Sequence, residues 1–304
     1  MPLTSQNPVP NDPIVPENDL VDRYEIKPPK LEVPDLPTVD GRRTDLDGAF
    51  PTPYEIHDGL PEGDVGSQQP TYPNYPETGV DAFRYAMRTA ELQVKRGEFR
   101  RALEALTVFY DSPDLAPIDQ QQLTDWLDAL AGKVIYSSEH LLELPYVTRQ
   151  GDTLQAIAAI YRVPPQLLFN INRSQINNPN VLLVGNELKV VRGPFEAHVD
   201  VDDEKLTLFL ENGKYYAGHF RVNIGNKPFP RVRNKPYRIH RIFSPKDRNN
   251  PFRDWWIDLG SEAAIHPVSD TADQSAPESI GLNSVDMADL ASILEEDCRV
   301  YIRR

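Results

Sequence analysis

The stretch that decides the fold is PYVTRQGDTLQAIAAIYRVPPQLLFNINRSQINNPNVLLVGNELKVVR, residues 145–192. It opens on a short apolar segment and turns at Gly151-Asp152, because a Gly-Asp pair suits a tight turn. Two helical faces follow, the first starting at Leu154 and the second entered through Pro164-Pro165. A closing apolar segment at 188–191 completes the order strand, helix, helix, strand.

Together these pieces resemble the LysM family over the family's whole length. The carrying motifs are Gly-Asp-Thr-Leu at 151–154, Ile-Ala-x-x-Tyr-x-Val at 157–163, Asn-Pro-Asn at 178–180 and Val-Gly-x-x-Leu at 184–188. One position departs from the pattern, since Gln155 stands where many members carry tryptophan. The resemblance implies a βααβ module over residues 145–192.

The resemblance further implies binding of peptidoglycan or chitin-like glycan, through N-acetylglucosamine, in a shallow groove between two loops. An N-acetylated sugar needs exposed backbone groups and an apolar floor, for which Leu154, Val181 and Leu182 are the candidates. Asp152 and Thr153 also fit the plainer roles of turn and helix cap. The candidate glycan-binding residues are Gly151, Asp152, Thr153, Leu154, Asn177, Pro179, Asn180, Val181 and Leu182.

Composition excludes several classes of partner. The chain has 304 residues and a formal net charge of −14, which disfavours nucleic acid and anionic lipid while leaving neutral glycans unaffected. No apolar run reaches the ~20 residues of a membrane span, and the first residues lack the features of a signal peptide. With Cys298 as the single cysteine, the sequence predicts no intramolecular disulfide, no metal site and no cofactor.

The first 78 residues hold about half of the 29 prolines and no long apolar run. Such a segment cannot bury enough apolar surface to offset the entropy of ordering. We therefore predict a disordered, proline-rich linker over 1–78. The alternative is a proline-motif ligand for a partner, since Pro-x-x-Pro spacings such as Pro10/Pro13 occur.

Residues 79–140 switch to helical periodicity, interrupted at Gly97. The segment resembles about one and a half tetratricopeptide repeats, although stacked repeats usually need three or more units to be stable. Two readings follow: a small helical bundle that docks on its neighbours, or a groove that binds an envelope protein partner. Asp119 is the expected cap of the third helix.

Residues 193–304 predict a mostly-β sandwich, with a hairpin turn at Asn212-Gly213, a helix over 285–294 and a last strand over 299–302. The segment resembles an L,D-transpeptidase (YkuD-type) domain. The motifs that carry this resemblance are Asn223-Ile224-Gly225, Asn250-Pro251-Phe252, Trp256-Ile257-Asp258-Leu259-Gly260, Ile265-His266 and Pro277-Glu278-Ser279-Ile280-Gly281.

The family places a nucleophilic cysteine in a Ser-x-Gly-Cys-x-Arg loop, with a histidine that activates it. One alignment puts Leu282 at the cysteine position. The other, which we prefer, matches 277–281 and 282–286 to the segments on either side of a deleted loop. Both leave His266 as a vestige and predict no catalytic residue. Cys298 is expected to pack in the core, since a thiol whose pKa is not lowered is mostly protonated at neutral pH.

The sequence therefore predicts a multidomain α+β protein: linker 1–78, helical bundle 79–140, LysM module 145–192 and transpeptidase-like domain 193–304. The predicted function is that of a noncatalytic protein that binds peptidoglycan, placed in the cell envelope by family resemblance. Two alternatives stay open, an active L,D-transpeptidase that remodels crosslinks and an interaction scaffold that uses the helical segment.

Overall fold

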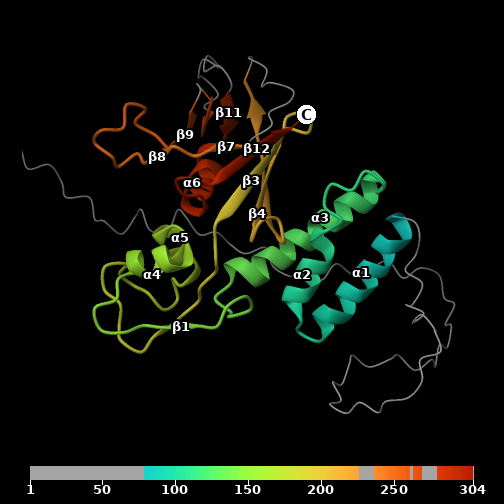
Figure 1. Cartoon of the computed structure of the whole chain (residues 1–304), viewed down its shortest axis with the longest axis horizontal. Helices are drawn as coiled ribbons and strands as arrows, with labels where there is room; N and C mark the ends of the chain where they lie inside the picture. The colour runs from blue at the N-terminus through green and yellow to red at the C-terminus, as the bar shows by residue number, and fades with distance from the viewer. Residues whose placement is uncertain (1–78, 226–235, 261–262, 269–278, 304) are drawn as a thin grey trace, which may run out of the picture.

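A computed structural model describes residues 79–225, 236–260, 263–268 and 279–303 as a mixture of helices and sheets (Figure 1). The prediction for residues 1–78 lies outside this part of the chain. The helical segment comes first, the βααβ segment follows, and two sheets with one helix complete the order. Within the described ranges, no helix is both long and apolar enough to cross a bilayer.

The first segment is all helical. Its elements are α1 (Gly79–Lys95), α2 (Phe99–Thr107), α3 (Pro117–Ala131) and η2 (Gly132–Tyr136), a π-helical turn that continues α3. Gly97 turns the chain between α1 and α2 with φ +76°, a value that glycine adopts at little cost. The prediction that Asp119 caps α3 was wrong. Pro117 begins the helix and Asp119 lies in its first turn, because proline suits the first helical position.

The βααβ order predicted for the middle segment is present. Its elements are β1 (Tyr146–Val147), α4 (Leu154–Tyr161), α5 (Pro165–Ile171) and β2 (Glu187–Leu188). The two short strands pair antiparallel, with Tyr146 opposite Leu188. The helices turn Leu154, Ile157, Leu167 and Leu168 inward, each at most 4% exposed. Because these apolar residues recur at helical spacing, each helix has one apolar face. Packing of these faces gives this short segment its own core.

Two five-stranded sheets make up the rest. The first has the order β5-β4-β3-β12-β7, with β12 parallel to β3 and the other pairs antiparallel. The second has the order β6-β11-β10-β9-β8, with β10 and β11 parallel. Contacts between β7 and β9 join the sheets. The first sheet comprises β3 (Phe195–Asp200), β4 (Lys205–Leu210), β5 (Tyr215–Arg221), β7 (Tyr237–Arg238) and β12 (Arg299–Arg303).

The second sheet carries the segment with the transpeptidase-like motifs. Its strands are β6 (Asn223–Ile224), β8 (Arg241–Phe243), β9 (Trp256–Gly260), β10 (Ala263–Pro267) and β11 (Ser279–Leu282). Helix α6 (Ser284–Ile293) follows β11 and contacts both β10 and α5. It therefore ties this sheet to the βααβ segment.

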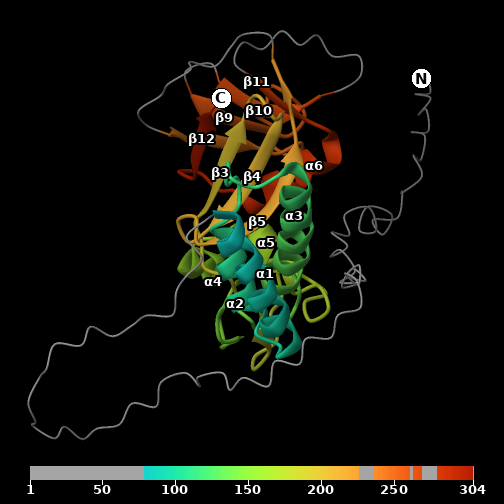
Figure 2. The ribbon, with the colours of Figure 1, turned by 90° about the vertical axis from the view of Figure 1, so that its right-hand side faces the viewer.

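The helical segment docks on the first sheet through contacts of α2 and α3 with β5 (Figure 2). The hydroxyl of the buried Tyr216 on β5 donates to the Asp128 carboxylate of α3 at 2.6 Å and lies 2.7 Å from His219 Nδ1, within hydrogen-bond distance. The Tyr216 backbone N–H donates to the Thr107 hydroxyl at 3.0 Å. Tyr136 donates to the Ala217 carbonyl at 2.7 Å. Buried hydrogen bonds therefore hold helices and sheet together.

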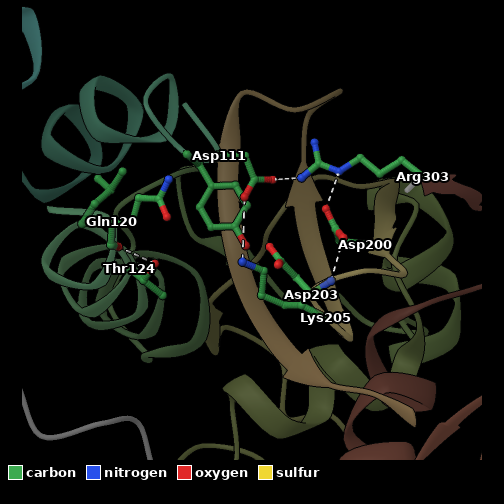
Figure 3. A pocket seen from close by; sticks show the side chains of 9 residues that line it. Asp111, Gln120, Thr124, Asp200, Asp203, Lys205 and Arg303 are labelled. Atoms are coloured by element: carbon green, nitrogen blue, oxygen red, sulfur yellow. Dashed lines mark hydrogen bonds and ion pairs between the residues drawn. The ribbon is translucent and has the colours of Figure 1, made fainter. Parts of the chain in front are cut away.

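A cavity of about 350 Å³ lies between α3, the turn joining β3 to β4, and the end of β12 (Figure 3). Arg303 spans it, donating to Asp200 at 3.1 Å and to Asp111. The Lys205 ammonium lies 3.8 Å from the other Asp111 oxygen. The basic side chains of this cavity therefore pair with its acidic side chains. We interpret the cavity as part of the contact between the helical segment and the first sheet.

Burial, together with the nearby Asp286 carboxylate, raises the pKa of the Asp289 carboxyl on α6 to about 6. Its charged form is disfavoured in the folded protein, so wild-type stability is lost as pH rises from about 4 through 6. We predict that Asp289→Asn raises the free energy of unfolding at pH 7 by about 1 kcal/mol, after allowance for partial exposure. Urea titrations should show the gain at pH 7 and none at pH 4.

Candidate glycan-binding site

The first loop of the candidate site is built on hydrogen bonds to Asp152 and Thr153. The Asp152 carboxylate accepts from the Arg149 N–H at 2.7 Å and from the Tyr146 hydroxyl at 2.9 Å. Thr153 caps α4 by accepting from the Ala156 N–H at 3.1 Å. The predicted turn and cap roles of these two residues are therefore confirmed, and their polar atoms set the shape of the loop.

Gly151 opens this loop with φ +86°. A Cβ placed at Gly151 would meet no atom within 4 Å, so its backbone borders open space. Any other residue would be strained at that φ, and the loop would lose its exposed peptide groups. The glycine thus has a conformational reason to be there that also suits close approach of a ligand.

The second loop is held by its own turn and by Thr148. The Asn178 side chain accepts from the Asn180 N–H at 2.9 Å, and the Asn178 carbonyl accepts from the Val181 N–H at 3.0 Å. Further along, the Gly185 N–H donates to the Thr148 carbonyl at 2.9 Å. The segment after β1 therefore lies beside the segment that ends the second loop. Hydrogen bonds within the chain hold both loops in place.

Exposure divides the candidate residues into two groups. Gly151, Thr153, Asn177, Pro179, Asn180 and Val181 are exposed, and Asp152 and Leu182 are half-buried. Leu154 is different, because only 4% of it is exposed. The prediction that Leu154 forms part of an open floor is corrected: it packs in the core beneath the first loop, where the first turn of an amphipathic helix places it.

An exposed apolar surface borders the second loop. Val181 is 58% exposed, Leu183 65% and Val184 67%. Three large aliphatic side chains open to solvent within four positions form an unusual concentration, since such residues are mostly buried. This segment, 181–184, supplies more apolar surface than the sequence prediction assigned to it.

A buried lysine locks the βααβ segment against the helical one. Lys189 is fully buried, and its ammonium donates to the Val134 carbonyl at 2.8 Å and to the Glu139 carbonyl. Burial lowers the pKa of Lys189 to about 8. Its backbone is held by Asn172, whose side chain accepts from the Lys189 N–H at 2.7 Å. Sequence reasoning missed this residue; its signal was a lysine inside an apolar closing segment.

His266 and Cys298 lie in different parts of the transpeptidase-like segment. His266, on β10, stacks on Trp256 at 4.9 Å and contacts the Pro267 carbonyl through Nδ1 at 3.0 Å. Cys298 precedes β12 in the other sheet and is 2% exposed, and burial raises the pKa of its thiol to about 11. No contact joins Cys298 to His266 in the described ranges. The prediction that Cys298 packs in the core is confirmed.

The connection after β11 is short. Leu282 ends β11 at 1% exposure, and Asn283 caps α6 by accepting from the N–H groups of Val285 and Asp286 at 3.1 and 2.9 Å. A single residue therefore separates strand from helix. The described chain therefore has no longer loop between β11 and α6.

The comparisons with known proteins agree with this geometry. Residues 146–191 match the model of the LysM domain. The "Putative L,D-transpeptidase YkuD" of Bacillus subtilis (strain 168) is 27% identical over 172 residues, which cover 53% of this chain and 99% of that protein. The chain thus combines a segment that matches the LysM domain with a segment that is similar to an L,D-transpeptidase. In particular, residues 146–191 of this chain are a LysM domain.

Two solved structures are similar to smaller parts of the chain. The structure of Bdellovibrio bacteriovorus Bd1075 covers 36% of this chain and 46% of its own, at 15% identity and a TM-score of 0.28. L,D-transpeptidase 1 of Mycobacterium tuberculosis covers 39% of this chain and 66% of its own, at 8% identity and a TM-score of 0.29. This chain thus spans less than two thirds of either structure.

Proposed function

We propose that this protein binds peptidoglycan, or a similar N-acetylglucosamine glycan, between the loops 151–154 and 177–182 of its LysM domain. The observation that carries the proposal is the pair of internally braced loops, with exposed backbone at Gly151 and exposed apolar surface at Val181. Both groups are uncharged, which suits a neutral acetylated sugar. Such a protein belongs in the cell envelope, where the polymer is.

Retention on the insoluble polymer tests this proposal. Val181→Glu places a charge in the groove and is expected to weaken binding at least tenfold, about 1.4 kcal/mol. The control is Ile160→Glu on α4, because Ile160 is 59% exposed against 58% for Val181 but lies outside both loops. Quantified pull-down with purified peptidoglycan should show loss for the first variant only. Equal retention of both variants would contradict the proposed groove.

We further propose that the transpeptidase-like domain acts without cysteine acyl transfer, as a scaffold or a binder of stem peptide. Support comes from the buried, high-pKa Cys298 thiol and from the single-residue connection at Asn283. A thiol with a raised pKa has almost no thiolate at neutral pH, and the thiolate is the nucleophile. Cys298, the single cysteine of the chain, is therefore a poor nucleophile for acyl transfer.

Mass spectrometry of muropeptides tests this second proposal. The wild type and Cys298→Ser should both leave a tetrapeptide-bearing substrate unchanged over long incubation. Cys298→Ser should also keep the protein folded, since serine is of similar size to cysteine. A newly crosslinked product that forms with the wild type and vanishes in Cys298→Ser would establish the rival function, an active L,D-transpeptidase.

A further inference from the structure

Three aromatic side chains stack at the second sheet. The stack includes Phe252 of the Asn250-Pro251-Phe252 motif, to which the proposed function assigns no role. Phe252 lies parallel to Trp256, with ring centroids 3.9 Å apart and planes 7° from parallel. Trp256 lies in turn on His266 at 4.9 Å and 12°. The order is Phe252, Trp256, His266, and Phe252 is the outer ring. It is 42% exposed, which makes it one of the open aromatic side chains of the described surface.

The loop that carries Phe252 is held rigidly. Asn250 is buried and donates to the carbonyls of Ser244 and Asp254 at 2.9 and 2.7 Å, while it accepts from the Phe252 N–H at 2.9 Å. The next residue, Arg253, has φ +58°, a conformation that costs energy outside glycine. The buried amide of Asn250 and the left-handed backbone of Arg253 thus hold Phe252 at the surface. The ring is therefore preorganised for contact with a ligand.

The flat exposed ring fits one kind of ligand in particular. One face of a pyranose ring presents C–H groups, which are apolar and carry slight positive charge, and the face of an aromatic ring is apolar and slightly negative. Hydrogen-bonding groups lie near this ring. Arg253 follows Phe252 in the chain, and Arg241 lies 4.6 Å over Phe243, whose ring meets that of Phe252 edge-on at 5.6 Å. A ring to stack on and polar groups beside it are what an uncharged sugar requires.

We propose that Phe252, backed by Trp256, is a second glycan-stacking site for the polymer that the LysM domain binds. In Figure 1 the segment that follows β8 and the helices α4 and α5 of the LysM segment all lie toward the left of the view. A long glycan strand that binds at both sites is held by two weak contacts, which together give much tighter retention than either alone. This inference rests on the proposed LysM function for the identity of its ligand.

The test measures retention of the full chain on insoluble, peptide-free N-acetylglucosamine polymer. Phe252→Ala is expected to weaken retention about tenfold, and Phe252→Trp, which keeps a stacking face, should retain it. The control is Leu92→Ala on α1, because Leu92 is 49% exposed and lies in the helical segment. Retention of Phe252→Ala within twofold of the wild type would overturn the inference.

A second measurement isolates the stack from the LysM groove. Titration of Val181→Glu with the soluble N-acetylglucosamine tetramer should still shift tryptophan emission. Trp256 lies directly under Phe252 and Trp255 is its chain neighbour, while the third tryptophan, Trp126, is buried. Unchanged emission would overturn the stacking site even if the alanine variant proved unstable. A response to peptide-bearing fragments only would also overturn it, in favour of a peptide contact.

The two proposals fail separately. Loss of polymer retention in Phe252→Ala but not in Val181→Glu supports the stacking site and contradicts the LysM groove. The reverse pattern supports the groove and contradicts the stacking site.

Discussion

Tyr216→Ala is expected to lower the free energy of unfolding by about 3–5 kcal/mol, the range for removing a buried aromatic ring. Tyr216 is fully buried, its ring lies 5.0 Å from that of Tyr110, and burial and Asp128 raise its pKa. Removing it also leaves Asp128 with only His219 among its hydrogen-bond partners in the described chain. The helical segment should then separate from the sheet more readily than the sheet unfolds.

Urea denaturation followed by circular dichroism measures the loss, and hydrogen exchange locates it. Tyr216→Phe keeps the ring and removes the hydroxyl, so it should cost about 1–3 kcal/mol. Tyr85→Ala is the matched control, because Tyr85 is 60% exposed on α1 and such a surface change should stay within about 0.5 kcal/mol. An effect of Tyr216→Ala below 1 kcal/mol would show that the helices do not depend on this contact.

Lys189→Met should change how stability depends on alkaline pH. The folded protein holds the Lys189 pKa near 8, below the value near 10.5 of an unfolded chain, so the unfolded state binds more protons between these values. The stability of the wild type relative to Lys189→Met should therefore rise from pH 8 to pH 10.5, by up to about 3 kcal/mol. Below pH 8 the difference should be constant.

Stability curves of both proteins from pH 6 to pH 11 give this difference directly. Other groups that titrate in alkali, including Cys298, are common to the two proteins and cancel. Lys95→Met is the control, because Lys95 is exposed at the end of α1 and its removal should leave a flat difference. A flat difference for Lys189→Met as well would mean that the buried amine does not titrate as its surroundings require.

The LysM fold could be predicted from the sequence because its determinants are local. The Gly151-Asp152 turn, the Thr153 cap and the apolar face of α4 lie within a few residues of one another, so each carries its own signal. The order of most strands and the position of α6 were likewise predictable from alternation and helical period. The resemblance to L,D-transpeptidases agrees with the match over 172 residues.

The missed features depend on contacts between residues far apart in sequence. Lys189 meets Val134 across 55 positions, and Tyr216 meets Asp128 across 88. Neither pairing leaves a periodic trace. The stack of Phe252, Trp256 and His266 needed the register of β9 and β10 before its order could be seen. The burial of Leu154 could not be predicted because it depends on which way the side chain points. In the sequence, a leucine at this position fits a binding surface and a helix interior equally well.

A crystal structure of the full chain soaked with an N-acetylglucosamine oligomer tests glycan binding at the LysM loops most directly. We expect sugar density between the loops 151–154 and 177–182, with an N-acetyl group hydrogen-bonded to backbone near Gly151 and its methyl against Val181. Well-ordered loops without any sugar, at oligomer concentrations of many millimolar, would contradict it.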